Sequence, residues 1–374
     1  MAASIAHEFD THVAHVVTYD EFNERENEWR DAPLIVMHDK SLTELTGPQA
    51  LLILLLSTVE SSRNPFFHTG CAYLPSTGDI YTTSDLLSPS SSSRYPVVLI
   101  SKTKLTTATK GPLSLEDSVV AQAEWTKLRP PKGMCMPSSC IAFRDGVLYC
   151  EQGNTNTTAP GLIYMPRGQP PQNLVNQYMG RPFNSPHGLC LDADANGIWF
   201  TDSTDGAVQG FRPKCRLPCL LYRLNLRTMK VKAMAEGFSR PTGVAVSPDG
   251  SRVYVADAGS KDELDDRIEG FIPKIYMFDV VSREDGLFLA NKSLFGHPLS
   301  DDITAIQCDS AGRVIAASSS GIEVWNHQGT FLGVIRVPGG VKSFAFGNTD
   351  DIILGSSQRL WRIQLKQREG EAEE

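Results

Sequence analysis

The sequence lacks the features that mark several large classes of protein. Its longest apolar run, Ala50 to Leu56, is far shorter than the roughly 20 residues needed to cross a bilayer. No basic stretch followed by an apolar stretch opens the chain, so we expect no signal peptide. Lysine and arginine (35) are outnumbered by acidic residues (43) and form no dense block, which argues against nucleic acid or an anionic membrane as a partner. We therefore expect a cytoplasmic protein.

Cysteine is scarce, and its spacing has no metal-binding or disulfide signature. The eight cysteines include no Cys-x-x-Cys pair, and most lie in apolar runs where they serve as small buried hydrophobes. Cys215 and Cys219 flank a short loop. A bridge between them stays open as an alternative, although a reducing cytosol opposes it.

Common catalytic fingerprints are also missing. The sequence contains no G-x-S-x-G nucleophile elbow, no phosphate-binding P-loop and no dinucleotide-binding glycine motif. We therefore expect no nucleotide cofactor, and no cofactor of any other kind is predicted.

What the sequence does contain is a repeated hairpin pattern. A run rich in β-branched and aromatic residues enters a turn of Gly, Asp, Asn or Ser, and a second run ends on a small or acidic residue. Six copies predict an all-β protein, a six-bladed β-propeller with one such hairpin in each blade. The copies are residues 71–85, 140–153, 189–206, 244–259, 305–321 and 344–357.

The rest of the chain is arranged around this propeller, which we assign to residues 61–366. Residues 1–60 lack the repeat, and part of them is expected to pair with the last blade and close the ring, because closure removes exposed strand edges. Within them, the apolar run at 50–56 predicts a buried strand or a short helix. The Ser-rich stretch 86–115 predicts an insertion or loop, and the acidic tail 367–374 is expected to fray.

Two segments in the middle of the chain carry longer motifs. They read RPFNSPHGLCLDADANGIWFTDSTDG (181–206) and EGFSRPTGVAVSPDGSRVYVADAG (236–259). Both resemble the SMP-30/gluconolactonase/LRE-like family, in its fungal lactonohydrolase-like branch, and the likeness extends from about Pro65 to Leu365. The resemblance implies a six-bladed propeller that hydrolyses lactones. It also implies a divalent cation in the central channel, held by one Glu and two or three Asn or Asp residues.

The ligand positions implied by this resemblance carry other residues. The family's first-blade Glu falls on Thr69, one Asn falls on His187, and a second Asn falls on Thr242. The late-blade Asp is matched by Asp301. Calcium-like ions are held by several oxygen ligands including carboxylates, so we expect no metal in this channel.

The same positions supply the candidate site. His187 is the expected acid–base or orienting group, since imidazole titrates near neutral pH. The predicted catalytic set is His187, Thr69, Thr242 and Asp301, with plain packing of the threonines and loop capping by Asp301 left as alternatives. Asp202 is interpreted as a structural turn residue. Predicted substrate-binding residues line the channel or its mouth: His68, Tyr73, Glu151, Gln152, Phe183, Gln209, Phe211 and Arg212.

Three functions from different classes remain. The first is a metal-independent enzyme of secondary-metabolite biosynthesis. In the loss of its metal ligands the chain resembles the hetero-Diels–Alderases of fungal tropolone-sesquiterpenoid pathways. Such a cyclase would join a quinone-methide-like tropolone to a terpene alkene in an apolar pocket, mainly by proximity and orientation. The second is a gluconolactonase-like lactone hydrolase, and the third is a non-catalytic binding propeller. Expected partners are apolar polyketide-terpenoid small molecules, and the sequence predicts no oligomeric state.

Overall fold

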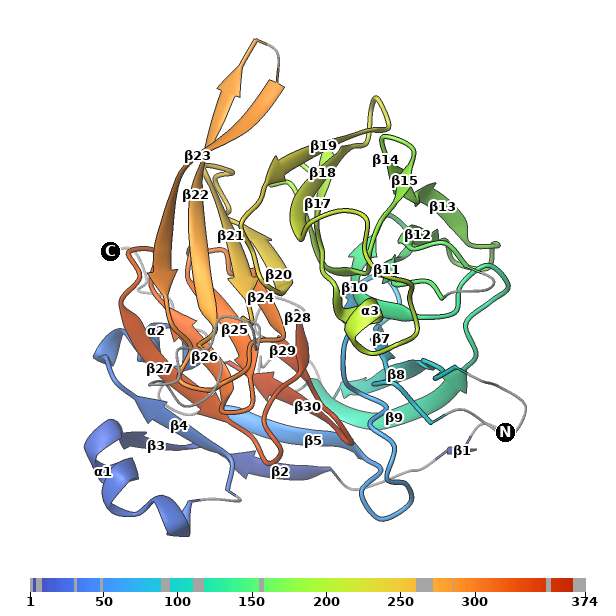
Figure 1. The fold of residues 1–374 in the computed structure, drawn as a ribbon. Coiled ribbons are helices and arrows are strands. Elements are labelled where there is room, and N and C mark those ends of the chain that lie inside the picture. The colour runs from blue at the N-terminus through green and yellow to red at the C-terminus, as the bar shows by residue number, and fades with distance from the viewer. Residues whose placement is uncertain are drawn as a thin grey trace.

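The protein is a six-bladed β-propeller, as predicted, in which six sheets are arranged around a central channel (Figure 1). The computed structural model describes residues 3–4, 9–29, 32–47, 50–88, 95–109, 118–154, 158–259, 272–284, 286–347 and 351–365. The predicted frayed tail, 367–374, lies outside the described residues.

The first three blades are built from consecutive antiparallel strands. Blade 1 contains β6 (Cys71–Leu74), β7 (Asp79–Thr83), β8 (Ile100–Thr109) and β9 (Ser118–Leu128), with β1 (Ala3–Ser4) at its edge. Blade 2 contains β10 (Pro137–Phe143), β11 (Gly146–Glu151), β12 (Gly161–Met165) and β13 (Gln172–Val175). Blade 3 contains β16 (Pro186–Leu191), β17 (Gly197–Asp202), β18 (Leu220–Asn225) and β19 (Lys230–Ala235).

The last two blades also include N-terminal strands. Blade 4 contains β20 (Pro241–Val246), β21 (Arg252–Asp257), β22 (Lys274–Arg283) and β23 (Gly286–Gly296). Blade 5 contains β24 (Ala305–Cys308), β25 (Val314–Ser318), β26 (Gly321–Trp325) and β27 (Phe331–Arg336), extended by β4 (Leu34–Met37) and β3 (His15–Thr18). Blade 6 contains β28 (Ser343–Phe346), β29 (Asp351–Ser356) and β30 (Arg359–Gln364), then β5 (Leu51–Ser57) and β2 (Asp10–Val13).

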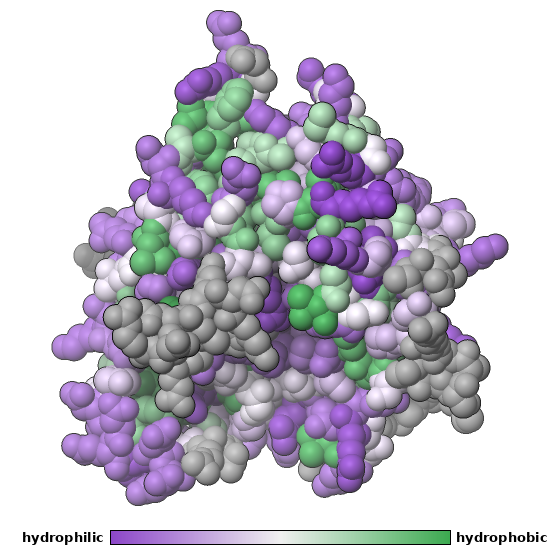
Figure 2. Space-filling model, viewed as in Figure 1, coloured by the Kyte–Doolittle hydropathy of each residue, from purple (hydrophilic) through white to green (hydrophobic). Residues whose placement is uncertain are grey.

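Short elements connect or flank the blades. They are β14 (Gln177–Tyr178), β15 (Arg181–Pro182), α1 (Tyr19–Glu24), α2 (Thr43–Thr46), α3 (Asp205–Val208) and the 3₁₀ turns Glu26–Glu28 and Lys40–Leu42. None of the helices in the described ranges has the length and apolar character needed to span a membrane. Figure 2 shows this face of the molecule as mainly hydrophilic, with hydrophobic residues in small separate patches.

Each of the six predicted hairpins forms the two innermost strands of one blade. The prediction for residues 86–115 was wrong in part, because β8 (Ile100–Thr109) lies within that stretch, where its first half pairs with β7 and its whole length pairs with β9. Its sequence, ISKTKLTTAT, alternates polar and apolar residues only weakly, so the strand depends on its neighbours more than on its own pattern.

The N-terminal segment adds strands to the last two blades of the ring, blades 5 and 6. β5 pairs antiparallel with β30 and supplies the fourth strand of blade 6, with Leu52 opposite Ile363. β4 pairs with β27 as the fifth strand of blade 5. In Figure 1 the blue N-terminal strands lie beside the red C-terminal strands. The run at 50–56 is therefore a strand, and its Leu52 is fully buried.

The first strands of neighbouring blades approach closely around the channel. A Cβ atom on Gly188 would lie 2.5 Å from the Cα atom of Gly243 in the next blade, and one on Gly70 would lie 2.6 Å from the carbonyl oxygen of Ser138. Real Cβ atoms do not tolerate such contacts, so these positions require glycine. The backbones of the first strands therefore lie in close contact at this level. The cavity described below is lined by the residues that precede these glycines, such as Thr69, His187 and Thr242.

Candidate functional site

Six equivalent residues, one from each blade, surround a cavity at the end of the channel. Each lies at or just before the start of the first strand of its blade and is followed by a small residue. The cavity has a volume of about 100 Å³. The six residues of this ring are Thr69, Ser138, His187, Thr242, Thr304 and Lys342.

Three hydroxyls of the ring are committed to the scaffold. Ser138 donates to the carbonyl of Pro186 at 3.0 Å, and Thr242 donates to that of Ile303 at 2.8 Å. Thr304 donates in the same way, within its own blade. Since a hydroxyl has one proton, these residues can only accept hydrogen bonds from a bound molecule. Thr242, predicted as a catalytic residue, lines the cavity, but its hydroxyl proton is already used and cannot be donated to a bound molecule.

His187 is oriented by one hydrogen bond. Its Nδ1 lies 2.8 Å from the carbonyl oxygen of Thr242. A carbonyl oxygen only accepts, so Nδ1 carries the proton and the neutral ring presents a lone pair at Nε2. Burial lowers the pKa of His187, while the carboxylate of Asp205 and the bond to Thr242 oppose that shift. The ring is thus neutral at pH 7 and is a base rather than a donor.

His68 and Thr69 form a second polar pair beside it. His68 Nδ1 lies 3.1 Å from Thr69 Oγ1, and His68 Nε2 lies 3.8 Å from a carboxylate oxygen of Asp85. Burial lowers the pKa of His68; Asp85 opposes this shift, whereas the positive charge of Lys342 adds to it, as does His187 when it is protonated. Both predicted residues therefore contribute to the cavity.

Two ion pairs complete the cavity wall. Lys342 Nζ lies 2.5 Å from Asp302 Oδ2, and Arg240 Nε lies 2.8 Å from Asp205 Oδ1. Asp302 also accepts a hydrogen bond from the backbone N–H of Ser319 at 2.7 Å. Burial would raise the pKa of Asp302, but the bonds from Lys342 and Ser319 outweigh it and hold that pKa low. The cavity thus contains two fixed cations.

Asp301 lies apart from this arrangement. Its side chain is exposed and is absent from the cavity lining. The neighbouring Asp302 is the residue that meets Lys342. Residues 299–301 form a bend before β24, so the direction of each aspartate is set by the path of this loop.

The donors around the cavity do not suit the divalent cation that the resemblance implied. Asp205 and Asp302 are each paired with a basic side chain, and the hydroxyl of Thr242 is already bonded. Across the described ranges, no group of three or more His, Cys, Asp or Glu residues could hold a metal ion. Hard cations need several free carboxylate or carbonyl oxygens, and this wall supplies mainly cations and hydroxyls.

Gln152 and Gln209 line the cavity, but Glu151 does not. Glu151 is fully buried at the end of β11, where its carboxylate accepts backbone hydrogen bonds from Met136 at 2.9 Å and Gly153 at 3.0 Å. Burial raises its pKa, against those bonds. Its geometry is that of a structural acceptor, because its oxygens face the backbone.

The remaining predicted residues form the surroundings of the cavity. Tyr73 packs against the hydrophobic cluster between blades 1 and 6, and Phe183 packs against aromatic rings of blade 3. Phe211 is buried. Arg212 donates to three backbone carbonyls. Phe183 and Arg212 line a second, larger cavity instead.

Several cavity residues were missed from the sequence. Lys342, Arg240 and Asp205 bring the charges, and Ser138 and Thr304 complete the ring. Alignment of the six first strands on one another would have found the ring, because the six residues precede Gly, Ser or Ala at the same position. All eight cysteines, including Cys215 and Cys219, are free thiols.

The comparisons with known proteins agree with the fold and with the resemblance. The chain is 24% identical over 355 residues to lactonohydrolase oryL of Aspergillus oryzae, covering 89% of this chain and 73% of that protein. It is 25% identical over 206 residues to a gluconolactonase of Zymomonas mobilis, covering 52% and 54% of the two chains. A solved gluconolactonase from Xanthomonas campestris has a TM-score of 0.68 and 19% identity, over 98% of this chain and 100% of that one. The predicted resemblance is confirmed: residues 191–355 match the family described as SMP-30/Gluconolactonase/LRE-like region, and the propeller fold is similar to that of the solved gluconolactonase.

Proposed function

We propose that the protein hydrolyses a lactone or another small cyclic ester in the cavity, with His187 as the general base. The observation that carries this proposal is the hydrogen bond from His187 Nδ1 to Thr242, which leaves Nε2 as an acceptor in the cavity that the cation of Lys342 also lines. The named sequence relatives, a lactonohydrolase and a gluconolactonase, support the same chemistry.

The cavity favours hydrolysis over the cyclase that ranked first from the sequence. That cyclase requires an apolar pocket for a terpene, but only Leu86, Val98 and Pro137 are apolar among the residues of this lining. The volume of about 100 Å³ is also below the roughly 300–1,000 Å³ of pockets for drug-sized ligands. A small polar ring suits such a space better than a sesquiterpene.

The reaction can be written with this chain's own groups. Nε2 of His187 takes a proton from a water molecule, and the water oxygen attacks the lactone carbonyl carbon. Negative charge then develops on the carbonyl oxygen, where Lys342 and the hydroxyl of Thr69 stabilise it. The C–O ester bond breaks, and the leaving ring oxygen takes the proton back from His187, so the product is a hydroxy acid.

Asp302 and Thr242 are positioning residues in this scheme. Asp302 holds the ammonium group of Lys342, and the carbonyl of Thr242 fixes the tautomer of His187. A fixed cation requires little reorganisation when charge develops in the transition state. General base assistance contributes about 10²- to 10⁴-fold.

The test is hydrolysis of a lactone panel by wild type and by two glutamine variants. The panel contains δ-valerolactone, γ-butyrolactone and glucono-1,5-lactone, each followed by acid release. H187Q should lose about 10²- to 10⁴-fold in kcat, because glutamine cannot accept the proton. H297Q is the matched control, since His297 also bonds a backbone carbonyl through Nδ1, at 3.0 Å from Pro273, but lies outside the cavity. Equal activity of the two variants, or no turnover of any lactone by wild type, would refute the proposal.

A further inference from the structure

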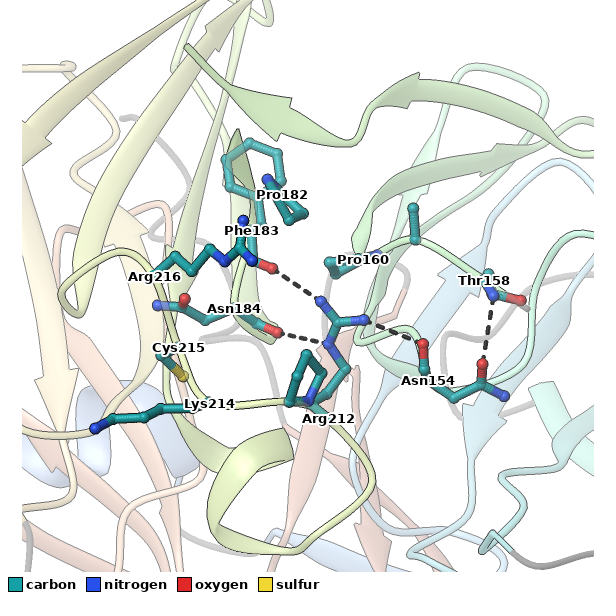
Figure 3. Close-up of a pocket in the computed structure, with 12 residues that line it drawn as sticks. Asn154, Thr158, Pro160, Pro182, Phe183, Asn184, Arg212, Lys214, Cys215 and Arg216 are labelled. Atoms are coloured by element: carbon teal, nitrogen blue, oxygen red, sulfur yellow. Dashed lines mark hydrogen bonds between the residues drawn. The ribbon is translucent and has the colours of Figure 1, made fainter. Parts of the chain in front are cut away.

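A larger cavity opens beside the ring, between the loops of blades 2 and 3. Its volume is about 780 Å³, within the range of small-molecule sites. One wall is the β11–β12 loop with Pro160, and the other is formed by the segment before β16 and by the β17–β18 loop with Arg212 and Arg216 (Figure 3).

The charge of this cavity is one-sided. Three of the residues that line it are basic, namely Arg212, Lys214 and Arg216, and none of its described lining residues is acidic. The chain as a whole carries a formal net charge of −8. A basic hollow in an acidic protein attracts anions selectively, since the local potential opposes that of the remaining surface.

Arg212 is built into the cavity as a cation without a carboxylate. Its Nε, Nη1 and Nη2 donate to the carbonyls of Asn184, Asn154 and Phe183 at 3.2, 3.1 and 3.3 Å (Figure 3). These bonds use three of the five N–H donors of a guanidinium and leave two. In the described part of the chain, Arg212 has no ion pair. Burial lowers the pKa of Arg212, and the nearby carboxylate of Asp202 opposes this shift. The oxygens of Asp202 already accept backbone N–H bonds from Asn184 and Ser185, so the two remaining donors of Arg212 have no direct carboxylate partner among the described residues.

Arg216 adds a second, adaptable cation. It is exposed, and in Figure 3 its side chain reaches toward Phe183 on the Arg212 side of the cavity, whereas Lys214 extends away. Pro160, Pro182 and Pro213 give the cavity rigid apolar walls. The combination of two guanidinium groups and proline walls suits an anion with an apolar body.

We propose that this cavity binds an organic anion, a carboxylate or phosphate ester on an apolar ring, with its charged group held by Arg212 and Arg216. Guanidinium groups bind both kinds of anion through paired N–H donors. The site adjoins the ring cavity, because Gln152 and Gln209 of that cavity lie on the same two loops as Asn154 and Arg212. Binding here is measured without turnover, so it stands apart from the proposed hydrolysis.

The experiment is isothermal titration calorimetry, in which the full chain is titrated with 2-naphthoate, 2-naphthyl phosphate or the neutral 2-naphthamide. At least one of the two anions should bind saturably, about tenfold or more tightly than the amide, and more weakly as salt screens the charges. R216A should weaken that binding by about tenfold, and R216K by less. R227A is the matched control, because Arg227 is an exposed arginine in the β18–β19 turn and should leave binding unchanged.

The outcomes separate the alternatives. Tighter binding of naphthoate assigns the site to carboxylates, and tighter binding of naphthyl phosphate assigns it to phosphate esters. Equal affinity for the amide would overturn the proposal, because charge would then contribute nothing. Equal effects of R216A and R227A, or no saturable binding of either anion, would overturn it as well.

Discussion

His187 differs from its five equivalents in the ring because its side chain can exchange a proton near neutral pH. The hydroxyls of Ser138, Thr242 and Thr304 are turned to backbone carbonyls, and Lys342 is held by Asp302. A ring of equivalent positions thus contains one base and one cation in a set of hydroxyls. The proposed hydrolysis depends on these two departures from the repeat.

The pH dependence of the reaction follows from the buried imidazole. Burial lowers the pKa of His187 below its ordinary value of 6.5, with Asp205 opposing and Arg240 adding to the shift. The basic form is needed, so kcat/KM should rise with pH and level off with a midpoint below 6.5. A pH–rate profile on a hydrolysed lactone measures this.

The neighbouring histidine provides the control for that profile. The pKa of His68 is also lowered by burial and by the charge of Lys342, and by His187 when it is protonated, with Asp85 opposing. H68Q should therefore keep the acid limb of the profile, whereas an acid limb above pH 6.5, or one that disappears in H68Q, would contradict the assignment.

The lowered pKa of His187 also predicts how the stability of the fold changes with pH. The unfolded chain binds the His187 proton more readily, so the free energy of unfolding should fall as pH drops below about 6.5.

Removal of divalent cations should leave the activity unchanged. The carboxylates of Asp205 and Asp302 are each neutralised by a basic side chain, and Thr69 and Thr242 provide only hydroxyls, which are weak ligands for hard cations. The measurement is the rate of lactone hydrolysis before and after dialysis against EDTA, with calcium and zinc added back. A rate that is lost on chelation and restored by either metal would show that this prediction is wrong.

At the scale of elements, carboxylates at strand ends hold the ring in place. Asp257, at the end of β21, accepts hydrogen bonds from the backbone N–H groups of Ser239 at 2.9 Å and Arg240 at 2.7 Å. Asp202, at the end of β17, does the same with Asn184 and Ser185, which is the structural role expected for it. Each bond set ties the second strand of a blade to the segment that leads into the first strand.

Replacement of such a carboxylate should cost stability. D257N keeps one acceptor but turns an N–H₂ group toward a backbone N–H, so one buried donor loses its partner. The free energy of unfolding should fall by about 1–3 kcal/mol, measured by urea denaturation. D279N is the control, because Asp279 lies on β22 and its side chain accepts, within the described ranges, from the exposed Asn291 alone; it should change stability by less than about 0.5 kcal/mol. A D257N effect no larger than that of D279N would contradict this role.

The elements were more predictable than the site because their signals are local. Each of the six inner hairpins carries its own apolar runs and turn residues, so the sequence predicted all six. β8, with its polar Lys102 and Lys104, depends on pairing with β7 and was missed. The choice between Asp301 and Asp302 depends on the path of one loop. Arg212 was predicted as a substrate-binding residue, but its place in the larger cavity depends on carbonyls from two segments, Asn154 in one and Phe183 and Asn184 in the other. Such arrangements exist only after folding.

At the scale of the whole molecule, the N-terminal segment pairs with strands of the last two blades, blades 5 and 6. β5 lies between β30 and β2 in blade 6, and β4 extends blade 5. Leu52 on β5 belongs to one buried cluster with Trp361 of blade 6 and Ile335 of blade 5. Closure of the ring therefore joins residues far apart in the chain, and the free edge of β30 is covered.

Truncation of Leu52 should weaken the entire propeller. The side chain is fully buried, and deletion of buried methyl groups removes transfer free energy and leaves a cavity, so L52A should lower the free energy of unfolding by about 2–5 kcal/mol. Urea denaturation followed by tryptophan fluorescence measures this, because Trp361 lies in the same cluster. L299A removes the same atoms from a side chain that is 54% exposed and should change stability by less than about 0.5 kcal/mol.

The same variant tests whether the cavity depends on closure of the ring. If blade 6 closes the ring, loss of lactone hydrolysis in L52A should follow the same urea transition as fluorescence, although Leu52 lies far from His187 in the sequence. Hydrolysis that survives the fluorescence transition would instead show that the active cavity does not require the N-terminal strand.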